Sequence, residues 1–83
     1  MNDVIEEIEK MSDKEAFLSF VQKLIDDYKA NPQEWENKTV DEYLDSMMSW
    51  VEDYSKSEFN DIDWNKIDYS VMAKILYMGK IYE

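Results

Sequence analysis

The residues best suited to chemistry in this sequence are carboxylates that stand close together. Asp61, Asp63 and Asn65 alternate as the first ligands of an EF-hand calcium loop do. Lys66 replaces the glycine that such a loop needs for its turn, and Met72 stands where the bidentate glutamate belongs. We therefore interpret the acidic pair as loop-capping residues and expect no metal site.

Adjacent carboxylates occur at three further places, which are Glu6–Glu7, Asp26–Asp27 and Glu52–Asp53. Neighbouring residues on a helix point about 100° apart, so none of these pairs converges on one proton or one metal ion. The sequence also lacks histidine and cysteine, which removes the usual bases, nucleophiles and zinc ligands. We expect solvated helix faces, no cofactor and no enzyme activity.

The charge of the chain is strongly negative, with a formal net charge of −11, and all nine of its cations are lysine. Lysine cannot make the planar bidentate phosphate contacts of arginine. A negative field repels nucleic acid and anionic membranes and attracts basic proteins. No apolar run approaches the roughly 20 residues that span a bilayer. We expect a cytoplasmic protein with a basic protein partner and no direct contact with nucleic acid or membrane.

The elements that must position these residues are helices. One glycine and one proline leave few positions for tight hairpins, and 83 residues suffice for one small core. The sequence predicts a single all-α domain, 1–83, built as a small bundle of about four helices. Apolar steps of three and four place these helices at 3–10, 13–30, 40–54 and 69–82. A one-turn helix at 32–36 and a long loop at 55–67 complete the prediction.

Short polar residues indicate where the helices begin and end. The S-D-K-E run from Ser12 and the T-V-D-E run from Thr39 have the form of capping boxes, and Asp68 suits the start of the last helix. Asn31 ends the second helix, because Pro32 disfavours helical geometry in the residue before it.

The helix predicted at 69–82 is apolar nearly all round. Lys74 and Lys80 are its only charges before the final glutamate. Such a helix is either central to a core or buried in an oligomer interface, so a homodimer is possible.

Two sequence blocks carry a resemblance to a known family. The first is W-E-N-K-T from Trp35, and the second is the A-x-x-L-x-x-x-K-I-Y-E ending from Ala73. Through them the chain resembles, over residues 12–54 and 69–83, a bacterial family of small acidic all-helical proteins of unknown function. The resemblance implies an all-α fold and a bacterial or phage source, and it brings no catalytic residue.

Acidic and aromatic residues interleave in the second half of the chain, which indicates a binding surface. Aromatic residues are enriched at interface cores, and acidic rims steer basic partners. The candidate partner-binding residues are Trp35, Glu52, Asp53, Glu58, Asp61, Asp63 and Trp64, of which the two tryptophans serve equally well as structural lids. We expect an immunity or inhibitor-type protein that neutralises a basic partner such as a toxin or nuclease. The alternative is a non-catalytic assembly module that self-associates through its apolar last helix.

Overall fold

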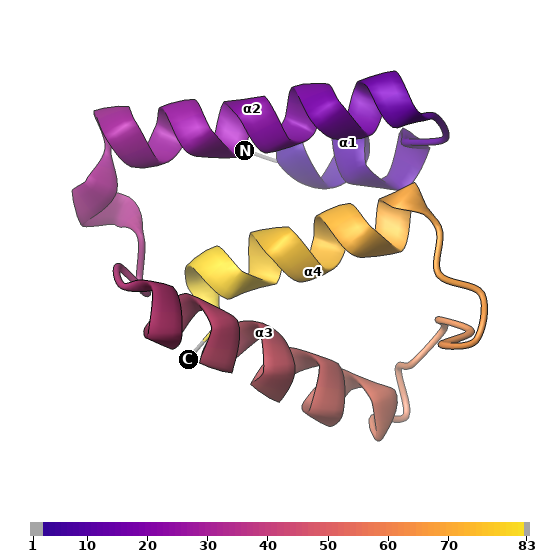
Figure 1. Cartoon of the computed structure of the whole chain (residues 1–83). Coiled ribbons are helices and arrows are strands. Elements are labelled where there is room, and N and C mark those ends of the chain that lie inside the picture. Colours follow the sequence, from indigo (N-terminus) through magenta and orange to yellow (C-terminus); the bar gives the residue numbers. More distant parts are fainter. Residues whose placement is uncertain (1–2, 83) are drawn as a thin grey trace.

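The computed structural model describes residues 3–82, which fold into helices joined by turns and loops (Figure 1). The helices are α1 (Asp3–Lys10), α2 (Lys14–Ala30), the short 3-10 helix η1 (Pro32–Glu34), α3 (Val40–Ser55) and α4 (Tyr69–Ile81). The predicted all-α class is confirmed. The predicted α-helices differ from the observed ones by at most one residue at an end, and the one-turn helix ends two residues earlier than predicted.

Short polar side chains start α3 and α4, as the sequence predicts. The Thr39 hydroxyl accepts the N–H of Glu42 at 3.3 Å, and the Glu42 carboxylate reaches back to accept the N–H of Lys38 at 3.2 Å. The Asp68 carboxylate accepts the N–H of Val71 at 2.9 Å. These bonds satisfy backbone donors that have no partner within the helix.

The start of α2 corrects one detail of the prediction. Asp13, and not Ser12, is the capping residue, because its carboxylate accepts the N–H of Ala16 at 2.7 Å. A carboxylate binds more strongly than a hydroxyl at the positive end of a helix. The helix therefore begins at Lys14, one residue later than predicted.

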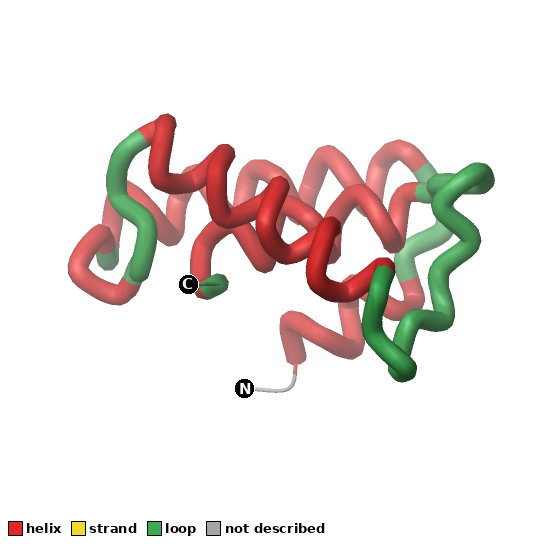
Figure 2. The backbone as a smooth tube through the Cα atoms, turned by 90° about the horizontal axis from the view of Figure 1, so that it is seen from below, coloured by secondary structure: helices red, strands yellow, loops and turns green. Residues whose placement is uncertain are grey.

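The last helix, α4, lies at the centre of the bundle. Its backbone packs against α1, α2 and α3, whereas the backbones of α2 and α3 do not approach each other (Figure 1). The central position accounts for the apolar character of α4 around its whole circumference. Loop segments gather at the two ends of the bundle, where Figure 2 shows the long connection between α3 and α4 opposite the link from α2 to α3.

The most buried part of the core forms where α1 meets α2 and α4. Its buried residues are Ile8, Met11, Phe20 and Ala73. Trp50 is also buried, on the α3 side of the molecule. The core is small, so each of these side chains carries a sizeable share of the stability.

Helices α3 and α4 pack tightly at Gly79. A Cβ atom there would lie 2.7 Å from Met47 Cγ and 2.8 Å from the ring of Tyr43. No glycine among the described residues has a positive φ, so space and not backbone conformation calls for glycine here. The Tyr43 hydroxyl donates to the Leu76 carbonyl at 2.6 Å and fixes the ring at this contact.

Candidate functional site: an apolar groove between α2 and α3

An open apolar groove of about 300 Å³ lies between α2 and α3, with a residue of α4 between its walls. It forms because both helices pack on α4 while their own backbones stay apart. The groove is lined by Val21, Leu24, Ile25, Tyr28, Lys29, Trp35, Tyr43 and Leu76. Its surface is almost wholly aliphatic and aromatic, and Lys29 is the one charged residue among these.

Further apolar side chains are exposed on both helices. Leu18 and Ile25 of α2 are 55% and 43% exposed, and Val40, Leu44 and Met48 of α3 are 76%, 55% and 65% exposed. Residues three, four or seven positions apart share a helix face, so each set forms one row. Val40 lines a hollow that shares Tyr28 and Tyr43 with the groove, and Leu44 and Met48 line another hollow beside Ile75 of α4. Exposed apolar area of this extent is typical of an interaction site.

Three aromatic rings pack in series along the groove. Tyr28 meets Trp35 edge-on with ring centroids 5.1 Å apart, and Trp35 stacks on Tyr43 at 5.9 Å. Burial raises the pKa of Tyr43 to about 12, so its hydroxyl is neutral at physiological pH. The Tyr28 hydroxyl donates to the Lys38 carbonyl at 2.8 Å. These contacts fix all three rings before any ligand binds.

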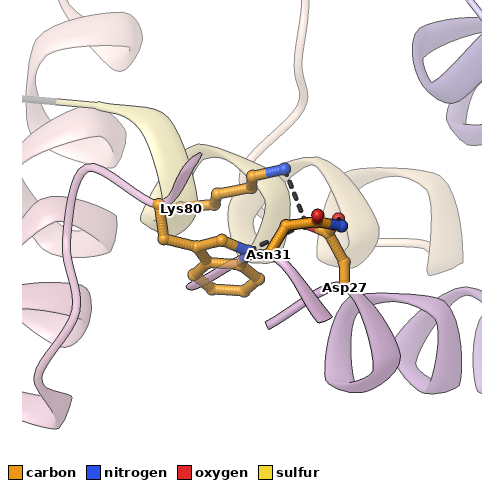
Figure 3. Close-up of polar contacts among 4 residues, drawn as sticks. Asp27, Asn31 and Lys80 are labelled. Carbon is orange, nitrogen blue, oxygen red and sulfur yellow. Dashed lines mark hydrogen bonds and ion pairs between the residues drawn. The ribbon is translucent and has the colours of Figure 1, made fainter. Parts of the chain in front are cut away.

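Trp35, a residue of the groove lining, contacts a polar cluster of Asp27, Asn31 and Lys80. Figure 3 shows the three side chains of this cluster together. The indole Nε1 donates to Asp27 Oδ2 at 2.8 Å, and Lys80 Nζ donates to the same oxygen at 2.7 Å. The Asn31 amide donates to the other carboxylate oxygen at 3.4 Å. Lys80 Nζ also lies 5.5 Å from the indole centroid, within cation–π range. Together with Trp35, the cluster links α2, the segment after η1, and α4.

The Asp27 carboxylate in this cluster is held in its charged form. The hydrogen bond from Lys80 lowers the pKa of Asp27 below its ordinary value of 3.8, the Trp35 hydrogen bond acts in the same direction, and burial opposes both. The side chains of Lys80 and Asp27 are 16% and 29% exposed. The carboxylate is thus engaged in a largely shielded ion pair and acts as a support for Trp35.

The seven residues predicted as partner contacts lie in two separate places. Trp35 is in the groove wall and only 7% exposed, so in the free chain it acts as a structural residue with one face toward the groove. The other six follow from the end of α3 into the loop that leads to α4. Contact of any of them with a partner stays a prediction.

Trp64 folds the loop back against α3. Its ring packs edge-on against Trp50 with centroids 6.3 Å apart, and its Nε1 donates to Asn60 Oδ1 at 2.9 Å. The Asp63 carboxylate accepts the N–H of Asn65 at 3.0 Å, as expected for a residue that caps a turn. Trp64 therefore acts as a lid on the core, which is one of the two roles expected for it.

The remaining acidic residues differ in how strongly they are engaged. Glu52 forms an exposed ion pair with Lys56 at 2.7 Å. Asp61 accepts a hydrogen bond from the Tyr54 hydroxyl at 2.8 Å, and Asp53 accepts one from the Tyr82 hydroxyl. Glu58 is exposed. All four carboxylates are open to solvent, so their charges are available to a passing partner.

Sequence reasoning missed the groove itself. Its wall residues Ile25, Tyr28 and Tyr43 fit the inner faces of regular helices, because helical spacing predicts a face and not the neighbour that the face meets. One signal was present, because Met48 lies beside the inner stripe of α3 and indicates some exposed apolar area.

The remaining chemistry of the described residues is limited. Across residues 3–82, no three carboxylate side chains gather as metal ligands would. The same residues form no helix with both the length and the apolar character that a membrane span requires.

The two blocks that carry the family resemblance meet in the structure. The Glu36 N–H donates to the Lys80 carbonyl at 3.1 Å, and the Asn37 amide donates to the carbonyls of Gly79 and Tyr82 at 3.0 and 2.8 Å. Carbonyls at the end of a helix have no partner within it, so these bonds cap α4. Glu36 and Asn37 of the W-E-N-K-T block therefore cap the end of the central helix.

Comparison with known proteins assigns the chain to a family. No curated protein and no solved structure matches it. The sequence model of one family, described as a family of unknown function, DUF7660, matches residues 13–83. The matched range includes α2, α3, α4 and the whole lining of the groove. The chain thus belongs to the DUF7660 family of unknown function.

Proposed function

We propose that this chain is a non-catalytic module that captures a basic protein, as an immunity or inhibitor protein neutralises a toxin or nuclease. The observation that carries the proposal is the presence of a preformed apolar groove on a molecule with a net charge of −11. A bacterial or phage source and a cytoplasmic location belong to the same proposal, and they rest on the resemblance and on the composition.

The acidic charge suits a partner because it is mostly not neutralised within the chain. Among the described residues, ion pairs engage Lys14, Lys23, Lys56 and Lys80, each with one carboxylate. The sequence has 20 acidic residues. A field of this kind raises the rate at which a basic protein encounters the surface.

Self-association through α4, the alternative, has less support. The apolar circumference of α4 is used by the three helices that surround it, and only Met72 and Ile81 among its large apolar side chains are appreciably exposed. Two copies would also each bring a net charge of −11 to the contact. Like charges facing each other oppose such an interface.

The test of the proposal uses the products of the genes that flank its own. Each basic product is purified and its association with this chain is followed at low and at physiological ionic strength. We expect one of them to bind, with an association rate that falls as salt is added. The proposal is contradicted if none of the basic gene products binds, or if the association rate of the one that binds does not change with salt.

A charge-matched pair of variants locates the acidic surface. Both variants replace three carboxylates by amides, which keep an oxygen acceptor for the hydrogen bonds within the chain. The loop variant is Glu58→Gln, Asp61→Asn and Asp63→Asn, and the control is Glu6→Gln, Glu7→Gln and Glu9→Gln. We expect the loop variant to slow association and flatten its salt dependence more than the control does. Equal effects would mean that the overall charge, and not the loop, guides the partner.

A further inference from the structure

We propose that the groove between α2 and α3 binds the apolar face of a basic amphipathic helix. The inference rests on the proposed function and goes further, because it names the surface that is used and the form of the segment that binds there. It places the main contact in the groove and not in the loop between α3 and α4, where most of the predicted partner-binding residues lie.

The shape and lining of the groove favour a helix. Its α2 wall runs from Val21 to Lys29, somewhat more than two helical turns, and the exposed Leu18 lies on the same helix one turn before Val21. A helix rises about 1.5 Å per residue, so a segment of about 12–15 residues covers this length. Side chains at positions i, i+3, i+4 and i+7 of that segment supply one apolar face, which is how helices dock in grooves.

The charges beside the groove select a basic segment. On α3, Asp41, Asp45 and Glu52 occupy the strip of helix that adjoins the exposed apolar row. On α2, Glu15 and Asp26 stand in the same relation to the row of Leu18 and Ile25, and all five acids are exposed. Glu15 and Glu52 are paired with Lys14 and Lys56, so Asp26, Asp41 and Asp45 are the three that have no ion pair within the described residues. Lysine or arginine at the margins of a bound apolar face would meet these carboxylates. Such complementarity favours correct partners and raises the association rate.

One end of the groove has the opposite charge. Lys29 lines it at the end of α2, and Lys38 lines an adjoining hollow that shares Tyr28 and Tyr43. The C-terminal end of a helix carries partial negative charge. The bound helix is therefore oriented with its C-terminus toward these lysines, parallel to α2.

A second copy of this chain fits the surface less well. The margins of the groove carry the same acids in both copies, and the net charge of each copy is −11. Mutual repulsion of that size opposes pairing through this face. A partner segment of opposite charge gains from the contacts that a second copy would lose.

The experiment uses three synthetic peptides of about 14 residues, the length that spans the groove. The first contains leucine and lysine in an order that gives one apolar face and basic margins. The second has the same composition in an order without such a face, and the third replaces lysine by glutamate. Each carries a fluorescent label, and binding to the full chain is measured by fluorescence anisotropy.

The first peptide is expected to bind about tenfold more tightly than the second, which equals about 1.4 kcal/mol. The third should not bind. The double variant Ile25→Gln, Tyr28→Gln, which changes two residues of the groove lining, should weaken binding of the first peptide by about tenfold. Both side chains are exposed in the free chain, so the fold should persist. The control variant is Phe59→Gln, since Phe59 is exposed in the loop and lies outside the groove.

Specific results would overturn the inference. Equal binding of the first two peptides, unaffected by the groove variant, would mean that charge alone attracts them, and the proposed function would still stand. Binding of the acidic third peptide would also contradict the inference. So would a dimer of this chain that prevents the first peptide from binding. If the double variant has a lower melting temperature than the unmodified chain, nuclear magnetic resonance of the unmodified chain tests the binding site instead. Amide shifts must then change along residues 18–29 and 40–48 on addition of the first peptide.

Discussion

At the scale of single residues, Asp27 joins parts of the chain that are far apart in sequence. Its carboxylate accepts hydrogen bonds from Lys80, which lies 53 positions away, and from Trp35. Because Trp35 lines the groove, the ion pair also shapes the candidate binding surface. A change at this carboxylate should therefore alter both the stability and the groove.

Asp27→Asn tests the ion pair through its pH dependence. The pKa of Asp27 in the folded chain lies below 3.8, so its charge stabilises the fold fully above pH 3.8 and progressively less as the pH falls through the folded pKa. We expect the variant to lose about 1–2 kcal/mol of unfolding free energy at neutral pH, because a hydrogen bond to a charged group is lost. Urea unfolding between pH 7 and pH 2 measures both effects.

The matched control is Glu52→Gln, which removes the exposed pair with Lys56. Exposed ion pairs contribute little, so its unfolding free energy should change by less than about 0.5 kcal/mol. Asp27→Asn should in addition lose part of the decrease in stability below about pH 4 that the unmodified chain shows. If the unfolding free energy of Asp27→Asn falls as steeply below pH 4 as that of the unmodified chain, the role assigned to Asp27 is contradicted.

At the scale of the elements, the order and bounds of the helices could be predicted from the sequence, because apolar spacing and capping residues are local signals. Thr39 and Asp68 start their helices as predicted, whereas the choice between Ser12 and Asp13 depended on which side chain bonds more strongly. The groove could not be predicted, because it depends on how α4 separates α2 from α3. Periodicity contains no information about that separation.

Gly79→Ala tests the tight contact between α3 and α4. Alanine favours a helix over glycine by about 1 kcal/mol, but the new methyl group would overlap Met47 and the Tyr43 ring. We expect a net loss of about 1–2 kcal/mol of unfolding free energy, since overpacking typically costs more than the propensity gains. Thermal unfolding measures the change.

A second substitution separates space from propensity. Lys74→Ala lies on the same helix, where alanine adds no atom to the contact at Gly79, and its effect should be small. The hydroxyl of Tyr43 offers a further readout, because a displaced ring should ionise below its present pKa of about 12. A more stable Gly79→Ala variant would show that the helices have room to separate.

At the scale of the whole molecule, the net charge of −11 opposes the compact state, whose radius of gyration is 12.7 Å. Salt screens charges over about 10 Å at 0.1 M, so carboxylates across the molecule repel one another less when salt is added. We expect sodium chloride to raise the melting temperature. The amide variant of Glu6, Glu7 and Glu9 should gain less from the same addition, and an unchanged melting temperature in both would contradict this view.

The central place of α4 also bears on how the protein is made. Residues that emerge from the ribosome first, such as Ile8 and Phe20, find their buried neighbour Ala73 only after most of the chain has been synthesised. At about 5–20 residues per second, the earlier helices spend seconds without their partner. During that interval the nascent chain exposes apolar surface, and its dense negative charge keeps neighbouring nascent chains apart.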